Sequence, residues 1–234
     1  MKEVFSRTSL MLGEDAMEKL KSARVIIFGV GGVGSYAFEA LIRSGVYDIT
    51  LVDSDVVSKS NINRQLIATH ESVGKKKVEV AMKRGLDINP EAKITPLELF
   101  YSEETKEKIN LNDYDYVIDA IDTVSSKILL IESATRLGVK IISSMGAGNK
   151  IDPTRFEVSD IHKTSVCPLA RVVRQRLKAL GIKKLKCVYS KETPFRTVVD
   201  EEGKTRHAPA SIATAPSAAG LIIASEVIRD IIGL

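Results

Sequence analysis

The sequence has few cysteines and little aromatic character. It contains two cysteines, Cys167 and Cys187, no tryptophan, and only 5% aromatic residues. Two isolated cysteines cannot build a disulfide framework, and no Cys-x-x-Cys pair is present to hold a zinc ion. We therefore predict no zinc site and expect a cytoplasmic protein rather than a cysteine-rich secreted one.

Long hydrophobic runs are also missing. Charged residues interrupt the apolar ones throughout 1–20, so we expect no signal peptide. The most apolar stretch, 219–234, contains Glu226, Arg229 and Asp230, which is typical of an amphipathic helix and not of a membrane span. With 234 residues, of which 44% are hydrophobic, the chain can bury one substantial core.

Strand and helix patterns alternate along the chain. Apolar strand patterns occupy 23–30, 48–53, 93–100, 114–122 and 139–148, and helical patterns occupy 32–44, 74–90 and 123–138. This alternation predicts an α/β fold with a Rossmann-like, mostly parallel sheet that is covered by helices on both faces. We assign residues 1–150 to this core.

The pattern changes after residue 150. A strand pattern at 154–161, a basic helix at 168–181 and a strand at 186–190 precede a polar, charged loop at about 190–209, which we expect to be mobile. A closing helix starts near Pro216. We predict that 151–234 is a basic C-terminal extension of the same domain.

A glycine-rich loop links the first strand pattern to the first helix. Gly29, Gly31 and Gly34 form a Gly-x-Gly-x-x-Gly motif, whose backbone amides can approach a phosphate at a helix N-terminus. Asp53 ends the second strand, where a carboxylate can accept hydrogen bonds from ribose hydroxyls. Both features suit NAD and ATP equally.

The stretch "VDSDVVSKSNINRQ" at 52–65 separates these two ligands. A second acid, Asp55, and then a Ser-Asn-x-x-Arg-Gln cluster ending in Arg64 and Gln65 follow Asp53, and lysines 75–77 begin the next helix. Each charge-assisted hydrogen bond from an arginine or lysine to a phosphate contributes about 1.5–3 kcal/mol. Hydride transfer has no use for such cations, so ATP is favoured. The helical period excludes Lys76 and leaves Lys75 and Lys77 as candidates.

Two aspartates end the strand pattern at 114–122. Asp119 and Asp122 are expected at the carboxyl edge of the sheet, where a carboxylate can hold the Mg²⁺ that bridges phosphates. We expect Asp119 instead to cap the helix that follows it.

Four motifs together, "GVGGVGS", "DSDVVSKSNINRQ", "VGKKK" and "DAID", resemble the adenylating superfamily of ubiquitin-activating, MoeB and ThiF proteins over residues 1 to about 150. The resemblance implies an ATP-binding adenylating core with catalytic Arg64, Lys77 and Asp122, the last at Mg²⁺. It also implies an Arg7 that reaches the phosphates of a partner subunit, and hence a homodimer. The ATP-binding residues that it implies, or that the motifs include, are Gly29, Gly31, Gly32, Asp53, Asp55, Ser60, Asn61 and Gln65.

Residues 142–164 and 168–182 are similar to the tRNA threonylcarbamoyladenosine dehydratases of this superfamily. This resemblance implies ATP-dependent adenylation of a threonyl carboxylate in tRNA, followed by cyclisation with net loss of water. Cys167 stands where that family has an aspartate. The sequence leaves open whether a monovalent cation binds near 146–150 and whether a sulfur-relay partner protein binds.

Charge is concentrated in one region. Between Lys163 and Arg206 there are twelve Lys and Arg against four acids, a local excess of +8 in a chain of net charge +4. Such a block suits a polyanion. Under the tRNA interpretation we predict phosphate contacts from one face of the basic helix and from the loop, namely Arg171, Arg174, Lys178, Arg196, Lys204 and Arg206.

Three other functions compete with this one. An enzyme that adenylates the C-terminus of a ubiquitin-like sulfur carrier would share every ATP residue. Superfamily members of that kind often carry Cys-x-x-Cys zinc pairs or an acceptor thiol, which this sequence does not provide. A non-enzymatic nucleotide-binding adaptor would not need Arg7, Arg64, Lys77 and Asp122 together, and a dehydrogenase would not need 52–65.

Overall fold

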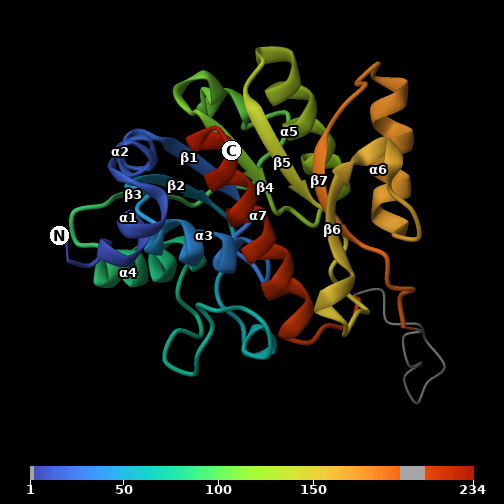
Figure 1. Cartoon of the computed structure of the whole chain (residues 1–234). Helices are drawn as coiled ribbons and strands as arrows, with labels where there is room; N and C mark the ends of the chain where they lie inside the picture. The colour runs from blue at the N-terminus through green and yellow to red at the C-terminus, as the bar shows by residue number, and fades with distance from the viewer. Residues whose placement is uncertain (1–2, 196–208) are drawn as a thin grey trace.

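The fold is built on one mostly parallel sheet. The computed structural model describes residues 3–195 and 209–234, and in them seven strands pair in the order β3-β2-β1-β4-β5-β7-β6 (Figure 1). The parallel strands are β1 (Arg24–Phe28), β2 (Asp48–Val52), β3 (Lys93–Leu97), β4 (Tyr116–Asp119), β5 (Lys140–Ser144) and β7 (Lys186–Ser190). Only the edge strand β6 (Phe156–Asp160) is antiparallel, to β7. The predicted α/β class is confirmed.

Helices cover both faces of the sheet, as predicted. One face carries α3 (Gly34–Arg43), α4 (Lys77–Ile88) and α7 (Thr214–Ile232), and the other carries α5 (Val124–Leu137) and α6 (Pro168–Ala179). Two further helices, α1 (Ser6–Leu12) and α2 (Glu14–Ser22), precede β1. The single-turn helices are η1 (Lys59–Asn61), η2 (Lys106–Lys108), η3 (Leu111–Asp113), η4 (Pro153–Arg155) and η5 (Ile161–Lys163). Strands β1 and β4 are apolar and buried almost throughout, as a sheet covered on two sides requires.

The strand register brings the candidate site residues to one edge. Phe28 of β1 is level with Val52 of β2 and with Asp119 of β4, so the residues that follow these three strands emerge side by side. The chain extends the sheet from β1 toward β3 and then returns to the other side of β1 with β4. Ligands bind at such a reversal of strand order in open α/β sheets.

The residues after 150 continue the same sheet. Strands β6 and β7 extend it from β5, and α7 packs back onto α3, where a side chain on Gly220 would lie 2.3 Å from the carbonyl oxygen of Val33. The division at residue 150 stays a prediction. Of the predicted loop, Phe195 donates a backbone hydrogen bond to Asn149, whereas Arg196, Lys204 and Arg206 lie outside the described residues.

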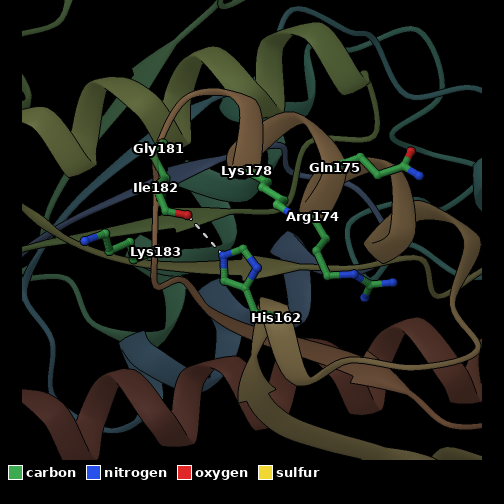
Figure 2. A pocket seen from close by; sticks show the side chains of 7 residues that line it. All are labelled: His162, Arg174, Gln175, Lys178, Gly181, Ile182 and Lys183. Carbon is green, nitrogen blue, oxygen red and sulfur yellow. Dashed lines mark hydrogen bonds between the residues drawn. The ribbon is translucent and has the colours of Figure 1, made fainter.

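Helix α6 runs from the carboxyl ends of the parallel strands back toward their amino ends. At its amino end, Cys167 Sγ lies 3.6 Å from the position that a Cβ on Gly146 would occupy, just past the carboxyl end of β5. At its carboxyl end, the turn that follows reverses the chain at Gly181, and the His162 Nε2 atom donates to the Ile182 carbonyl at 3.0 Å (Figure 2). The basic helix predicted at 168–181 is confirmed.

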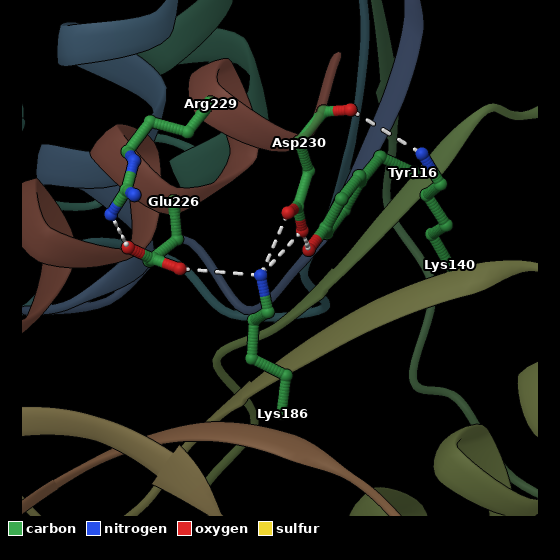
Figure 3. Close-up of polar contacts among 6 residues, drawn as sticks. All are labelled: Tyr116, Lys140, Lys186, Glu226, Arg229 and Asp230. Atoms are coloured by element: carbon green, nitrogen blue, oxygen red, sulfur yellow. Dashed lines mark hydrogen bonds and ion pairs between the residues drawn. The ribbon is translucent and has the colours of Figure 1, made fainter. Parts of the chain in front are cut away.

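A polar network joins the C-terminal part of α7 to the amino ends of the parallel strands. Figure 3 shows Asp230 at its centre, where it accepts from Tyr116 Oη at 2.6 Å and from Lys186 Nζ at 2.7 Å. Lys186 also reaches Glu226 at 3.2 Å, and the backbone carbonyl of Asp230 accepts from Lys140 at 3.3 Å. The network joins α7 to β4, β5 and β7.

We expect Asp230→Asn to lower the free energy of unfolding by about 1.5–3 kcal/mol at pH 7, as for the loss of hydrogen bonds to a charged group. Burial alone would raise the pKa of Asp230, but hydrogen bonds from Lys186 and Tyr116 outweigh it and hold that pKa below its usual range. Because the folded pKa is lowered, this stabilisation is present above the unfolded pKa of about 3.9 and is lost as the pH falls through the folded pKa.

Urea titrations at neutral and at acidic pH measure this loss. The exposed Asp87→Asn on α4 is the matched control and should change stability little at either pH. An Asp230→Asn deficit that did not shrink in acid would contradict the prediction.

Candidate active site

The glycine loop folds tightly between β1 and α3. Gly29 has φ +89°, and a Cβ there would lie 2.6 Å from the Ala120 carbonyl oxygen. A Cβ on Gly34 would lie 1.8 Å from the Gly29 carbonyl oxygen. Neither position tolerates a side chain, which explains why the loop needs these glycines. The loop thereby lies directly against the segment that leaves β4.

Asp53 ties the glycine loop to the end of β2. Its Oδ2 accepts from the Val30 backbone N–H at 2.7 Å and its Oδ1 accepts from the Asp55 backbone N–H at 2.9 Å. Burial raises the pKa of Asp53, against the opposing effect of Lys77 and of these two hydrogen bonds. Each carboxylate oxygen keeps a second lone pair, which is what the predicted ribose contact would need.

Lys77 is the lysine whose ammonium group lies at this site. It is only 5% exposed, and its Nζ lies 2.6 Å from Asp55 and 3.8 Å from Asp53. Lys75 instead faces Glu71 at 4.0 Å, and Lys76 pairs with Glu98 at 2.7 Å. Of the two lysines that periodicity leaves open, the geometry agrees with the one that the resemblance implies.

Arg64 lies beside the glycine loop. A Cβ on Gly32 would be 3.5 Å from Arg64 Cγ, and Arg64 Nη1 donates to the Ser60 carbonyl at 2.9 Å and to Asn63 Oδ1 at 3.0 Å. Arg64 lies in the turn that follows η1, which ends at Asn61. The backbone N–H of Ser58 donates to the Asn61 side chain at 3.0 Å, as part of a capping box that fixes the start of η1.

Gln65 carries an unpaired polar atom at the same place. Its side chain is buried, and its Oε1 has no hydrogen-bond partner in the described part of the chain. Its Nε2 lies 3.7 Å from the position of a Cβ on Gly31. Buried polar atoms are nearly always hydrogen-bonded, so this amide oxygen is free to accept from a water or a ligand beside the loop.

The two aspartates after β4 have different environments. Asp122 is exposed, and its one contact among the described residues is with the Thr123 hydroxyl at 3.4 Å. Asp119 does not cap α5 as predicted, because Thr123 is the N-cap residue. Asp119 is fully buried and pairs instead with Lys127 at 2.7 Å, so that prediction is wrong.

Lys127 is a residue that the sequence analysis missed. It is fully buried on α5, and its Nζ also donates to the Ser144 carbonyl at 3.0 Å. A signal for it exists, since Lys127 shares the buried face of α5 with Leu130, Ile131 and Ala134. A lysine on an apolar helix face requires a buried acidic partner.

Residues 146–151 and 209–216 complete the border of the site. The Asn149 N–H donates to the Ala210 carbonyl at 2.7 Å, Asn63 donates to the Ser211 carbonyl at 2.9 Å, and Pro216 lies 3.2 Å from a Cβ placed on Gly32. Lys150 is 3% exposed, and burial lowers its pKa. These segments are distant in sequence, and the motifs in 1–122 do not predict their approach. In residues 3–195 and 209–234, no group of three or more His, Cys, Asp or Glu could hold a metal ion.

The comparisons with known proteins agree with this geometry. The ThiF family model matches residues 5–234. The Bacillus subtilis tRNA threonylcarbamoyladenosine dehydratase is 46% identical over 97% of this chain and 94% of the relative. This chain belongs to the ThiF family, and within it to the tRNA threonylcarbamoyladenosine dehydratases.

Solved structures of this dehydratase family are also similar. The Escherichia coli tRNA threonylcarbamoyladenosine dehydratase TcdA, in complex with ATP, has a TM-score of 0.90 at 33% identity and covers 99% of this chain and 95% of its own. The same protein is also known in complex with AMP. Escherichia coli MccB with ATP, at 22% identity and a TM-score of 0.70, shares the fold alone. The described part of this dehydratase contains no helix long and apolar enough to cross a membrane.

The remaining predicted residues of this dehydratase lie away from the glycine loop. Arg7 is exposed on α1, whose neighbour Phe5 packs on Tyr47 at a ring distance of 6.0 Å, just before β2 begins. Tyr47 lies at the amino ends of the strands, whereas the glycine loop lies at their carboxyl ends. On α6, Arg171 and Lys178 are exposed, whereas Arg174 is partly buried and donates to Thr164.

The cysteines of this dehydratase are buried. Cys187 is fully buried in β7, and burial raises the pKa of its thiol to about 12. A thiol that stays protonated at neutral pH is a poor nucleophile. We expect Cys187→Ala to retain activity within a few-fold of the parent protein in a dehydration assay, because the side chain acts in packing alone. Loss of all activity in a protein that still folds would contradict this expectation and would indicate a thioester intermediate at Cys187.

Proposed function

We propose that this dehydratase uses ATP at the glycine loop to adenylate the threonyl carboxylate of its tRNA substrate, and that it acts in the cytoplasm. The observation that carries the proposal is that Arg64 lies beside Gly32 of the glycine loop and that Lys77 lies beside Asp53, whose carboxylate binds the same loop. A relative at 46% identity is named tRNA threonylcarbamoyladenosine dehydratase, and the ATP complex of the Escherichia coli protein supports the choice of nucleotide.

The residues present fit ATP. The unpaired Gln65 oxygen can accept a hydrogen bond from the ligand, and the bare backbone at Gly31 and Gly32 lets phosphates approach the amides of the loop. Asp55, whose side chain is 65% exposed, holds Lys77 at the site. When ATP binds, the Lys77 ammonium group can exchange Asp55 for a phosphate oxygen. Asp122 would hold Mg²⁺, which neutralises phosphate charge when bound.

The chemistry begins with an unreactive carboxylate, whose leaving group would be oxide. In the proposed first step, a carboxylate oxygen of the threonyl group attacks the α-phosphorus of ATP in line, and the bond to pyrophosphate breaks. Arg64 and Lys77 stabilise the charge that develops on the phosphate oxygens. The product is an acyl-adenylate, in which AMP is a good leaving group.

The second step closes the ring. A nucleophilic atom of the same modified adenosine attacks the acyl carbon and loses its proton, and AMP leaves with the former carboxylate oxygen. Because the nucleophile is tethered to the acyl group, its effective concentration is very high and no enzyme thiol is required. The substrate loses one water in total, and ATP becomes AMP and pyrophosphate.

A second subunit would supply a further cation. Within one chain Arg7 lies at the edge of the sheet opposite to the glycine loop, so it can act on ATP only from another copy. We propose a homodimer in which the partner subunit's Arg7 reaches the phosphates. The exposed apolar side chains of Leu10 and Met11 on the same helix, 88% and 84% exposed, suit burial in such an interface.

Mass spectrometry of tRNA tests the proposed function. Threonylcarbamoyladenosine-modified tRNA incubated with the protein, ATP and Mg²⁺ should lose the mass of one water, with AMP and pyrophosphate formed in equal amounts. Omission of ATP should leave the tRNA unchanged. An unchanged tRNA, together with adenylation of the C-terminus of a ubiquitin-like sulfur carrier, would favour the rival function.

A further inference from the structure

An open basic pocket lies at the end of α6 that is remote from the candidate active site. It has a volume of about 680 Å³ and is lined by His162, Arg174, Gln175, Lys178, Gly181, Ile182 and Lys183. Figure 2 shows these residues around His162, with Arg174, Gln175 and Lys178 on α6 and Gly181, Ile182 and Lys183 in the turn after it. The ATP-dependent reaction described above makes no use of this pocket.

The cations of the pocket are not neutralised by the protein. Arg174, Lys178 and Lys183 form no ion pair with an acid in the part of the chain that the structure describes. Elsewhere on the surface, lysines such as Lys93 and Lys106 lie 2.9 Å and 2.7 Å from carboxylates. Unpaired like charges on neighbouring residues repel one another, which is a cost that a bound polyanion removes.

Arg174 is held in position to bind an anion. Its Nη1 donates to the Thr164 carbonyl at 2.9 Å and to the Thr164 hydroxyl at 2.7 Å. Both acceptors are neutral, so the guanidinium keeps its charge, and its Nε and Nη2 donate to nothing among residues 3–195 and 209–234. A guanidinium that is already oriented loses little further entropy when it forms hydrogen bonds to phosphate.

Helix α6 connects this pocket to the candidate active site. Its amino end lies beside Gly146 at the carboxyl edge of the sheet, and its twelve residues give it a length of about 18 Å. Arg171 is exposed on the same side of the helix as Lys178, between the two ends. Arg171 and Lys178 thus place two cations on one side of α6 between the border of the candidate active site and the pocket, where a long nucleic-acid backbone could contact both.

We propose that this pocket binds the sugar–phosphate backbone of the tRNA substrate at a point remote from the reacting adenosine. The proposal rests on the proposed function for the identity of the RNA. The ligand is an RNA and not a free phosphate, because the pocket is wide and open and its cations stand on separate long side chains of α6 and of the turn after it. Contacts of that kind become strong only when one ligand occupies several of them.

A salt series with matched variants tests the proposal. The double variant Lys178→Ala/Lys183→Ala removes two cations of the pocket, and Arg176→Ala/Lys184→Ala removes two cations of the same helix and turn that do not line it. Binding of the full-length chain to a tRNA transcript is measured from low to high salt. The slope of log K against log salt should fall by about 1.4–1.8 for the pocket variant, at about 0.7–0.9 per phosphate contact, and change little for the control.

Two further measurements separate this proposal from the proposed function. Both variants should bind ATP as the parent protein does, and the pocket variant should show a raised KM for tRNA at an unchanged kcat. Equal slopes for the pocket variant and the parent would overturn the phosphate site even if dehydration were observed. A lowered slope without any dehydration would retain the site and overturn the proposed function instead.

Discussion

Arg64→Ala is expected to lower kcat/KM for ATP-dependent dehydration by about 10²–10³-fold, the cost of removing one preorganised group that stabilises transition-state charge. Arg64 has no carboxylate partner among the described residues and bonds only to the Ser60 carbonyl and the Asn63 side chain. Its loss leaves no buried charge unpaired, so the fold should persist. Arg64→Lys keeps the charge but loses the planar guanidinium, so its kcat/KM should lie between those of the parent protein and of Arg64→Ala.

Single-turnover formation of AMP measures this effect, and a urea titration of each variant confirms folding. Lys59→Ala is the matched control, since Lys59 is an exposed cation in η1, five residues before Arg64. The control should form AMP at nearly the parent rate. An Arg64→Ala variant that released pyrophosphate as fast as the parent would remove Arg64 from the reaction.

Lys127→Met is expected to lower the free energy of unfolding by about 3–5 kcal/mol, the usual cost of breaking a buried ion pair by removal of one partner. Lys127 and Asp119 are both fully buried and lie 2.7 Å apart. Methionine fills a similar volume, so the cost is electrostatic and not that of a cavity. Without the lysine, Asp119 keeps only neutral partners, namely the Ser143 hydroxyl and the Ile121 N–H.

The double variant Lys127→Met/Asp119→Asn isolates the pair. It removes both charges, so it should be more stable than Lys127→Met alone, and together with the Asp119→Asn single variant it gives the coupling between the two side chains. Lys83→Met, at an exposed position on α4, controls for the substitution itself and should be nearly neutral. A Lys127→Met protein as stable as the parent, or a double variant less stable than the single one, would contradict the assigned role.

The features that are local in sequence could be predicted. The position of the glycine loop could be predicted because the segments before and after it have clear strand and helix patterns. Asp53 could be placed as well, since it follows directly at the end of the next strand. Periodicity alone could not choose between Lys75 and Lys77, since both flank the buried face of α4. The choice in the structure depends on Asp55, which lies 22 residues away from Lys77 along the chain.

The features that depend on distant contacts could not be predicted. The sequence predicts Asp119 as a helix cap, because a carboxylate before a helix usually caps it, but in the structure Asp119 binds Lys127 and Ser143 instead. The approach of 209–216 to Gly32 depends on the packing of α7 against α3, and no short motif encodes it. The distance of Arg7 from the glycine loop likewise becomes visible only when α1 is placed in the fold.

The most direct test of the proposed chemistry is the fate of the oxygen that the substrate loses. The carboxylate of the threonyl group in tRNA is labelled with oxygen-18, and the AMP from one turnover is examined by mass spectrometry. Attack on the α-phosphorus predicts one heavy oxygen in each AMP and none in pyrophosphate. Unlabelled AMP, with the heavy oxygen in inorganic phosphate, pyrophosphate or water, would contradict the formation of an acyl-adenylate at Arg64 and Lys77.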